Sequence, residues 1–460
     1  MKLRKDIKIF IVGGGEIGSA LAGQLSRDGY ELTVIDRNQD VVGSLGNSMD
    51  IICYEGNGAS YETLKDLGAG KADIWIAVTE SDELNILSCM TAHMLGAKHT
   101  IARIRNVDYA KQNHFYRDKL GLSMIINPDL ATAMEIGRLL RFPLATRVEV
   151  FAKGRAELVE MSVREDSPLN GKSLIEINRN MGIDLLICAV VRLGEAFVPK
   201  GDTVICKGDI LYLTGAADEF RKAFKKLGVP VKPLKSVMIA GGGRISYYLA
   251  ELLLHQGSKI TLIEKNKEMA TEISGKIPGI NVICDDALAY FDSMSQSDIL
   301  KTDAFITITD NDEYNLIAAM FGESQGIGKV ISRINAKSRL KVLSSESKIC
   351  TISRGDVAAD RILGYSRSLL NAEDNDAVES LYRLVDGKLE FIEFKVDEKD
   401  KNLDIPLKDL TMKQNMLIGC IFRDLRTIIP RGDDVIKAGD TVLVASINRQ
   451  IARLEDIFAS

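Results

Sequence analysis

Residues 9–38 read IFIVGGGEIGSALAGQLSRDGYELTVIDRN, and this stretch decides the fold. A short apolar run precedes three glycines, apolar residues at helical spacing follow them, and a second apolar run ends at Asp36. That order predicts a strand, a tight turn, a helix and a second, parallel strand. The glycine segment, Gly13-Gly14-Gly15-Glu16-Ile17-Gly18, fits the G-x-G-x-x-G spacing of dinucleotide-binding folds.

Each glycine of that spacing has a physical reason. Gly13 permits the tight turn, Gly15 lets a pyrophosphate approach the backbone, and Gly18 lets the helix pack closely on the strand. The phosphate would then lie on free N–H groups at the helix N-terminus. Asp36 would accept hydrogen bonds from the adenosine ribose and would repel a 2′-phosphate, which favours NAD(H) over NADP(H). ATP and ADP share that ribose, so they remain open as ligands.

The chain contains this pattern twice. Residues 237–266 read VMIAGGGRISYYLAELLLHQGSKITLIEKN and align with residues 9–38 without a gap. Further along, ADIWIAVTESDELN faces TDAFITITDNDEYN, and VPKGDTVICKGD faces IPRGDDVIKAGD, at a nearly constant spacing. The molecule is therefore predicted to be a tandem duplication of a unit of roughly 230 residues.

The second glycine loop differs from the first at two positions. It reads Gly241-Gly242-Gly243-Arg244-Ile245-Ser246, with Glu264 in the place of Asp36. Ser246 replaces the packing glycine, and Glu16 of the first loop lies beside the expected phosphates. We expect the first crevice to be the more secure binding site, although the charge of Glu16 would weaken phosphate binding there.

Other candidate residues follow later strands of each unit. Loops at the carboxyl ends of parallel strands line the ligand cleft of such folds. In the first unit these are Thr79, Glu80 and Arg103, and in the second they are Thr309, Asp310 and Arg333. Each arginine would pair with a phosphate or ribose, or else form a salt bridge on a solvated face.

Each unit is predicted to split into a Rossmann-like, doubly wound parallel-sheet domain and a small α+β domain. Alternating strand and helix patterns fill the first part of each unit, and short strands such as Leu185–Val191 fill the second. The expected fold is therefore α/β with four domains, at residues 1–145, 146–230, 231–370 and 371–460.

The remaining composition excludes several classes of function. The net charge of −5 gives no pull toward nucleic acid, and no apolar run reaches the length of a membrane span. The seven cysteines are dispersed and are expected to be reduced thiols rather than metal ligands. No catalytic motif surrounds any of the four histidines, His93, His99, His114 and His255. Duplicated nucleotide-binding units without a catalytic partner favour a ligand sensor over an enzyme.

The order of motifs resembles the TrkA family, the cytoplasmic nucleotide-binding subunits of Trk-type potassium uptake systems. The resemblance covers nearly the whole chain and includes GGGEIG with Asp36, VTESDELN, IARIR, SPLNGKSLIEI and VPKGDTVICKGD, most of them repeated. In that family the domains are called RCK-N (TrkA-N) and RCK-C (TrkA-C), and two such pairs in one chain are typical of TrkA.

The resemblance implies a regulatory protein rather than an enzyme, and the lack of a Cys/His cluster with zinc spacing predicts no metal site. It implies binding of NAD(H), and of ATP or ADP as an alternative, by the residues named above. It also implies a homo-oligomer, a tetramer with a ring of N-domains, attached at the inner face of the membrane to a TrkH-type potassium translocator. Two alternatives remain open: a soluble NAD-dependent oxidoreductase, and a nucleotide-sensing regulator of another cation carrier.

Overall fold

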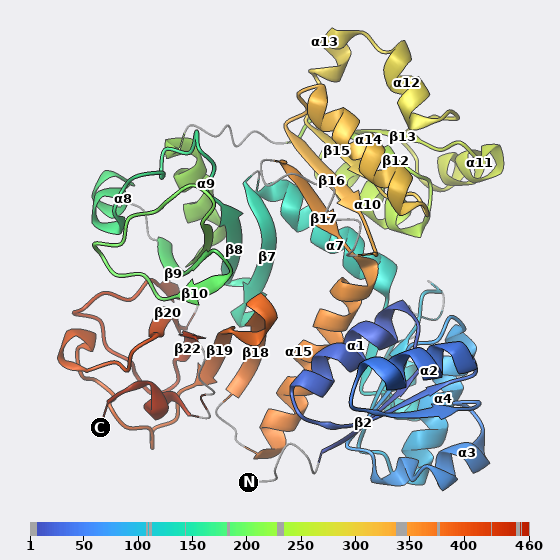
Figure 1. Cartoon of the computed structure of the whole chain (residues 1–460), viewed down its shortest axis with the longest axis horizontal. Coiled ribbons are helices and arrows are strands. Elements are labelled where there is room, and N and C mark those ends of the chain that lie inside the picture. The colour runs from blue at the N-terminus through green and yellow to red at the C-terminus, as the bar shows by residue number, and fades with distance from the viewer. Residues whose placement is uncertain are drawn as a thin grey trace. The chain divides into compact units, whose positions relative to one another are not determined.

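The computed structural model describes residues 7–459 except 107, 108, 110–112, 143, 182–184, 228–233, 337–346, 375–377, 425, 448–450 and 452. The chain divides into two compact units (Figure 1). Unit 1 consists of Met1–Ile136, Ser236–Lys341 and Thr351–Ser366, and unit 2 consists of Gly137–Lys235, Val342–Cys350 and Arg367–Ser460. The tandem sequence is thus sorted by kind, with both parallel sheets largely in unit 1 and both antiparallel sheets in unit 2.

The first sheet of unit 1 has six strands in the order β3-β2-β1-β4-β5-β6, and its strand pairs are parallel. This order, which extends to both sides of the first strand, is that of a doubly wound fold and confirms the predicted class. The strands are β1 (Lys8–Val12), β2 (Glu31–Asp36), β3 (Ile52–Glu55), β4 (Ile74–Ala77), β5 (His99–Arg103) and β6 (Met124–Ile126). The helices are α1 (Glu16–Arg27), α2 (Gln39–Ser48), α3 (Tyr61–Asp66), α4 (Asp82–Leu95), α6 (Asn113–Leu120) and α7 (Pro128–Arg141).

The second sheet repeats the first with the order β14-β13-β12-β15-β16-β17. Its strands are β12 (Ser236–Ala240), β13 (Lys259–Ile263), β14 (Asn281–Ile283), β15 (Ala304–Thr307), β16 (Lys329–Arg333) and β17 (Ile349–Ile352). Its helices are α10 (Arg244–His255), α11 (Lys267–Lys276), α12 (Ala287–Ser293), α13 (Gln296–Ile299), α14 (Asp312–Ser324) and α15 (Arg354–Asp374). The internal duplication seen in the sequence is therefore a duplication of the fold.

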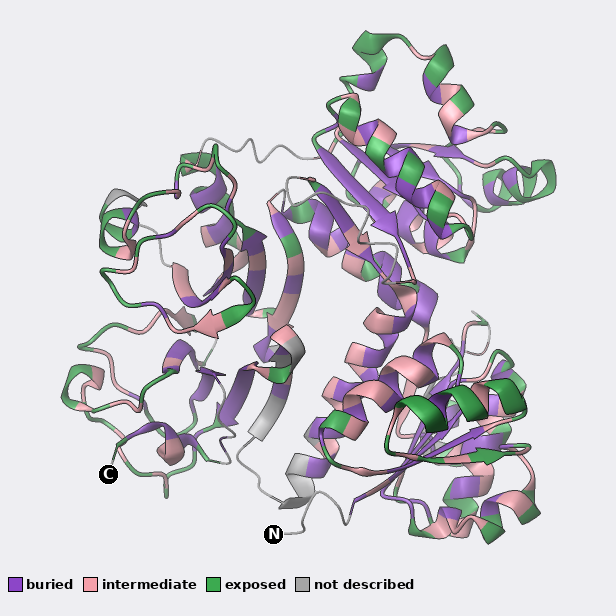
Figure 2. Ribbon diagram, viewed as in Figure 1, coloured by how far each residue is buried: buried purple, intermediate pink, exposed green. Residues whose placement is uncertain are grey.

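The central strands are apolar on both faces because helices cover both faces of the sheet. Ile9, Ile11 and Ile76 are fully buried, and Trp75 stacks on Phe10 at 5.1 Å between ring centroids. Figure 2 shows the same pattern along the strands of both parallel sheets, where buried residues dominate. This rigid apolar core holds the loops at the carboxyl ends of the strands.

Unit 2 contains two five-stranded antiparallel sheets, ordered β10-β9-β11-β8-β7 and β18-β19-β22-β20-β21. The strands are β7 (Ala145–Phe151), β8 (Ala156–Ser162), β9 (Leu185–Arg192), β10 (Glu195–Phe197), β11 (Ile210–Gly215), β18 (Val378–Leu384), β19 (Leu389–Lys395), β20 (Met416–Arg423), β21 (Arg426–Ile428) and β22 (Thr441–Ile447). Two helices, α8 (Leu174–Met181) and α9 (Ala217–Lys226), accompany the first sheet.

The two antiparallel sheets share one apolar core. Phe151 contacts Phe391 and Tyr382 across the boundary between them, and the hydroxyl of Thr214 donates to the carbonyl of Gly419 at 3.1 Å. Burial raises the pKa of the thiols of Cys188 and Cys420 well above the ordinary value, so both are packing residues of this core. The small domains thus form an internal pair within one chain.

The predicted strands and helices agree with the structure to within a few residues, and the residue boundaries between the four domains stay predictions. Among the described residues, no helix is long and apolar enough to cross a membrane.

Candidate functional site

Both glycine loops adopt the turn for which glycine is needed. The φ angle is +100° at Gly13 and +106° at Gly241, in the region that side chains other than glycine rarely adopt. A Cβ on Gly13 would lie 3.0 Å from the amide nitrogen of Thr79. Each loop therefore passes close to the residues that directly follow β4 or β15, Thr79 in the first copy and Ile308 and Thr309 in the second.

The acidic residue at the end of the second strand holds each loop in place. The carboxylate of Asp36 accepts from the amide of Gly14 at 2.6 Å and from that of Asn38 at 2.8 Å. Glu264 makes the equivalent bonds to Gly242 at 2.6 Å and to Asn266 at 2.7 Å. A carboxylate offers about four acceptor positions, so each acid keeps capacity for the hydroxyls of a ribose.

A buried asparagine organises the loop that follows the fourth strand. The Asn315 amide oxygen accepts from the backbone N–H and the hydroxyl of Thr309, at 2.9 and 2.7 Å. Its nitrogen donates to the carbonyls of Thr309 and Arg333 at 2.9 and 3.0 Å. Asn85 makes the same four bonds to Thr79 and Arg103 in the first copy. Thr79 and Thr309 are thereby committed to loop structure through their hydroxyls.

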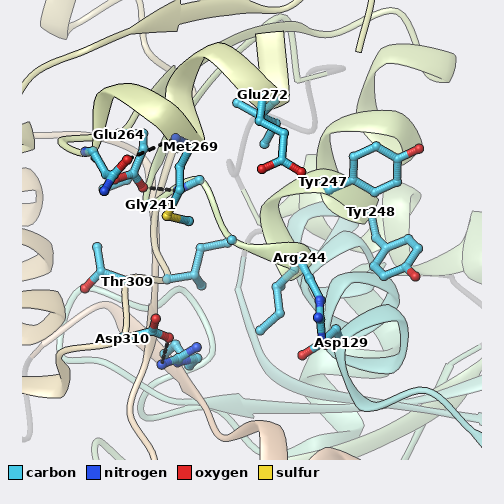
Figure 3. A pocket seen from close by; sticks show the side chains of 18 of the residues that line it. Asp129, Gly241, Arg244, Tyr247, Tyr248, Glu264, Met269, Glu272, Thr309 and Asp310 are labelled. Carbon is cyan, nitrogen blue, oxygen red and sulfur yellow. Dashed lines mark hydrogen bonds and ion pairs between the residues drawn. The ribbon is translucent and has the colours of Figure 1, made fainter. Parts of the chain in front are cut away.

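A pocket of about 1560 Å³ lies at the second glycine loop (Figure 3). Its walls include the loop Gly241–Ile245, the acid Glu264 and the following strand ends Thr309 and Asp310. In the view of Figure 3, Arg244 and Asp129 lie together on one side of it, and Thr309 and Asp310 lie on the other. The pocket therefore combines one glycine loop with residues of the first N-terminal domain, among them Glu80, Arg105 and Asp129.

Three arginines of this pocket have unused hydrogen-bond donors. Arg105, Arg333 and Arg354 line it, and the Nε of each is buried without a hydrogen-bond partner. Arg333 is only 6% exposed, and one of its terminal nitrogens lies 3.2 Å from the fully exposed carboxylate of Asp310. Buried cationic donors without partners favour an anionic ligand, because leaving them unpaired is costly.

The first glycine loop has a different neighbour. The carboxylate of Glu16 accepts from the backbone N–H of Gly355 at 2.8 Å and from a terminal nitrogen of Arg354 at 2.9 Å. Both partners belong to the first turn of α15, which comes from the second copy. In the reverse direction, Asn127 at the start of α7 donates to the hydroxyl of Tyr248 on α10 at 3.1 Å. In unit 1, the N-terminal end of α15 from the second copy thus contacts α1, and the N-terminal end of α7 from the first copy contacts α10.

The comparison with protein families decides which family these features belong to. The TrkA-N domain matches residues 9–128 and 237–351, and the TrkA-C domain matches residues 158–228 and 391–459. The chain belongs to the TrkA family. The resemblance expected from the sequence motifs is confirmed, as is the assignment of the parallel sheets to TrkA-N domains and of the antiparallel sheets to TrkA-C domains.

Full-length TrkA relatives are found in archaea and bacteria. A Trk system potassium uptake protein TrkA homolog of Archaeoglobus fulgidus is 28% identical over 98% of this chain and 100% of its own length. The Trk system potassium uptake protein TrkA of Halomonas elongata is 28% identical over 98% of both chains.

Among solved structures, the GsuK channel bound to NAD matches 96% of this chain and 77% of its own length, with a TM-score of 0.60 and 17% identity. The GsuK RCK domain gives a TM-score of 0.59 at 18% identity, with 96% of this chain and 92% of that chain covered. These likenesses confirm the fold expected of a TrkA chain.

The TrkA fold brings most of the predicted site residues to their glycine loops. Asp36 and Thr79 contact the first loop, and Glu264 and Thr309 occupy the same places at the second. Glu80 lines the pocket of the second loop. Gly18 and Ser246 both lie against the turn, and the hydroxyl of Ser246 donates to the carbonyl of Gly241.

Arg103 does not lie on a solvated face, so the alternative interpretation of this residue as a surface salt-bridge partner is wrong. It is 6% exposed, and its Nε is buried without a hydrogen-bond partner. Burial, followed by the nearby charges of Arg105 and Arg354, lowers the pKa of Arg103 to about 10. This side chain belongs to the same cationic cluster as the pocket arginines.

Sequence reasoning missed several residues of this TrkA site. Arg354 and Asp129 start helices that are distant in sequence from the loops they meet, so no local pattern marks them. Asn85 and Asn315 could have been found, because each stands six residues after the threonine in both copies. Among the described residues, no group of histidine, cysteine and carboxylate side chains could hold a metal ion.

Proposed function

We propose that this TrkA family chain is a regulatory subunit of a Trk-type potassium uptake system, and that it binds an adenine nucleotide, NAD(H) foremost. The proposal rests above all on the pocket at the second glycine loop. That pocket unites the phosphate-binding turn, the ribose acid Glu264 and arginines with unused donors in one cavity. At about 1560 Å³, it exceeds the roughly 300–1,000 Å³ of a typical small-molecule site, which suits an extended dinucleotide.

The residues of the second copy have distinct roles in this proposal. The backbone N–H groups of Gly241 to Ile245 would receive phosphate oxygens at the start of α10. Glu264 would accept the ribose hydroxyls, and its charge disfavours a 2′-phosphate. Arg333 would neutralise phosphate charge, while Thr309 and Asp310 would shape the mouth of the pocket. The name of the similar GsuK structure, bound to NAD, supports this choice of ligand.

The equivalent residues of the first copy are Gly13, Gly14, Gly15, Glu16, Ile17, Gly18, Asp36, Thr79, Glu80 and Arg103. Their backbone arrangement matches that of the second copy. Their assignment to a nucleotide site stays a prediction. ATP and ADP remain alternative ligands for either crevice.

Regulation would follow from differential binding. A ligand shifts a conformational equilibrium only by the difference in its affinity for the two states. The pocket has walls from both TrkA-N domains, so a nucleotide there would favour one arrangement of the two. A coupling of about 1–3 kcal/mol would change the activity of an attached transporter roughly 5–150-fold.

An exposed apolar stripe supports assembly into a homo-oligomer, for which we propose a tetramer with a ring of TrkA-N domains. Leu87 and Met94 on α4 are 52% and 79% exposed, and Ile317 and Met320 on α14 are 57% and 42% exposed. Leu87 and Ile317 occupy equivalent positions of the duplication, so each copy offers a similar contact surface. The membrane partner in this proposal is a TrkH-type potassium translocator, which would hold the chain at the inner face of the cell membrane.

Potassium flux is the direct test of this proposal. The chain would be reconstituted with its translocator in vesicles, and potassium uptake would be measured with NADH, with NAD, with ATP, with ADP and without nucleotide. We expect uptake to differ among these conditions by at least fivefold. Equal uptake in all of them would contradict the gating role. Turnover of NADH with a panel of metabolites would instead favour an oxidoreductase.

Replacing Glu264 by Ala should weaken NAD binding in the second crevice about tenfold, because hydrogen bonds to the ribose and the bond to Gly242 are lost. Isothermal titration calorimetry on the full chain measures this change. Asp36→Ala is the matched variant in the first copy, and it should keep the fold and leave NAD binding in the second crevice unchanged. If the affinity for NAD is unchanged in Glu264→Ala, Glu264 is not part of the site.

A further inference from the structure

A negatively charged side chain of the chain itself, the carboxylate of Glu16, lies beside the first glycine loop. The two oxygens of the Glu16 carboxylate accept separately from Gly355 and Arg354, at 2.8 and 2.9 Å. Gly355 lies in the first turn of the 21-residue helix α15, where backbone N–H groups are free and negative charge is favoured. Burial lowers the pKa of Arg354, but the hydrogen bond to Glu16 and the negative charge of Glu16 outweigh this effect. The pKa of Arg354 is therefore raised above its ordinary value.

This contact is tight as well as charged. A Cβ added to Gly355 would lie 2.6 Å from the Cγ of Glu16, so the start of α15 packs directly on the Glu16 side chain. Glu16 is itself the first residue of α1, next to the phosphate-binding turn. A nucleotide phosphate at this turn would meet both the negative charge of Glu16 and the helix that Glu16 holds in place.

The second loop shows the opposite arrangement. Arg244 stands at the position that is Glu16 in the first copy, and it is exposed in the pocket near Asp129 (Figure 3). Asp129 itself lies 3.7 Å from a terminal nitrogen of Arg354, so the charge next to the turn is negative in the first copy and positive in the second. At the second loop the glycine-loop helix thus begins with a cation that faces an open cavity.

We infer that Glu16 and Arg244 determine which glycine loop takes the nucleotide: Glu16 closes the first crevice as an internal anion, and the chain binds one nucleotide, in the second crevice. This inference rests on the proposed nucleotide binding and makes it more specific. It also modifies the expectation from the sequence, in which the first crevice is the better site.

Calorimetric titration of the full-length protein with NAD tests the inference. The wild type is expected to bind one NAD per chain, and Glu264→Ala is expected to weaken that event. Glu16→Gln, which keeps the shape of the side chain but removes the charge, is expected to gain a second binding event. Glu16→Ala is the second variant, because alanine suits the start of a helix and removes the side chain that contacts α15.

Glu62→Gln is the matched control. Glu62 is an exposed acid in the first turn of α3 in the same domain, so its replacement makes the same change in net charge away from both loops. We expect the control to bind one NAD, as the wild type does. Melting curves of all variants verify that the chain is folded.

The outcomes separate the inference from the proposed function. Two NAD molecules per wild-type chain, or one whose binding is lost in Asp36→Ala but kept in Glu264→Ala, would overturn the inference and leave nucleotide binding intact. A single event in both Glu16 variants would also overturn it. If the folded wild type binds neither NAD nor ADP at millimolar concentration, the proposed function itself fails.

Discussion

Replacement of Gly18 by Ser is expected to destabilise the first TrkA-N domain by about 3 kcal/mol, although serine stands at the same position of the second copy. A Cβ on Gly18 would lie 1.8 Å from the carbonyl oxygen of Gly13. That oxygen belongs to the backbone of the turn, so relief of the clash requires movement of the loop or of the whole helix α1. The second loop has adjusted to Ser246, whose hydroxyl donates to the carbonyl of Gly241.

The reciprocal variant, Ser246→Gly, is the control for this prediction. It removes one hydrogen bond and places glycine in α10, which together cost about 1–2 kcal/mol without any clash. Thermal melts and urea unfolding of both variants measure the difference. Equal stability of Gly18→Ser and the wild type would show that the first turn moves as easily as the second.

Arg333→Met is expected to weaken NAD binding about 10–150-fold, because hydrogen bonds to a charged group contribute roughly 1.5–3 kcal/mol each. Arg333 is buried, lines the second pocket and has an unused Nε donor. Methionine fills a similar volume without the charge. The ligand-free protein should therefore keep or gain stability, since an incompletely paired buried cation is removed.

Calorimetry with NAD and melting curves without it provide the two readouts. Arg103→Met is the matched control, because Arg103 is equally buried and occupies the same place in the first copy. If only the second crevice binds, this control keeps the wild-type affinity. An unchanged dissociation constant in Arg333→Met would remove Arg333 from the nucleotide site.

The sequence predicted what depends on local pattern. The glycine turns, the acids Asp36 and Glu264 and the order of strands and helices follow from spacing within some thirty residues, and the structure places them as expected. The tandem organisation followed from comparison of the chain with itself. The pairing of the two small domains through a shared core did not, because nothing in one strand indicates which other sheet covers it.

The sites of the two copies were harder to rank. From the loops alone, the intact third glycine favours the first copy and Ser246 counts against the second. The structure adds contacts between residues more than three hundred positions apart, such as Glu16 with Arg354. Such contacts leave no periodic signal in either partner. The charge difference between Glu16 and Arg244 was visible, but its partner residues were not.

The covalent fusion of two units has a consequence for how such a chain can evolve. In an assembly of identical single units, every subunit would carry the same residue at the position of Glu16, and a substitution would alter all crevices together. With both units in one polypeptide, a mutation can alter one glycine loop and leave the equivalent loop of the other unit unchanged. Every assembled particle then holds the two kinds in equal number, without any need for separate chains to select each other.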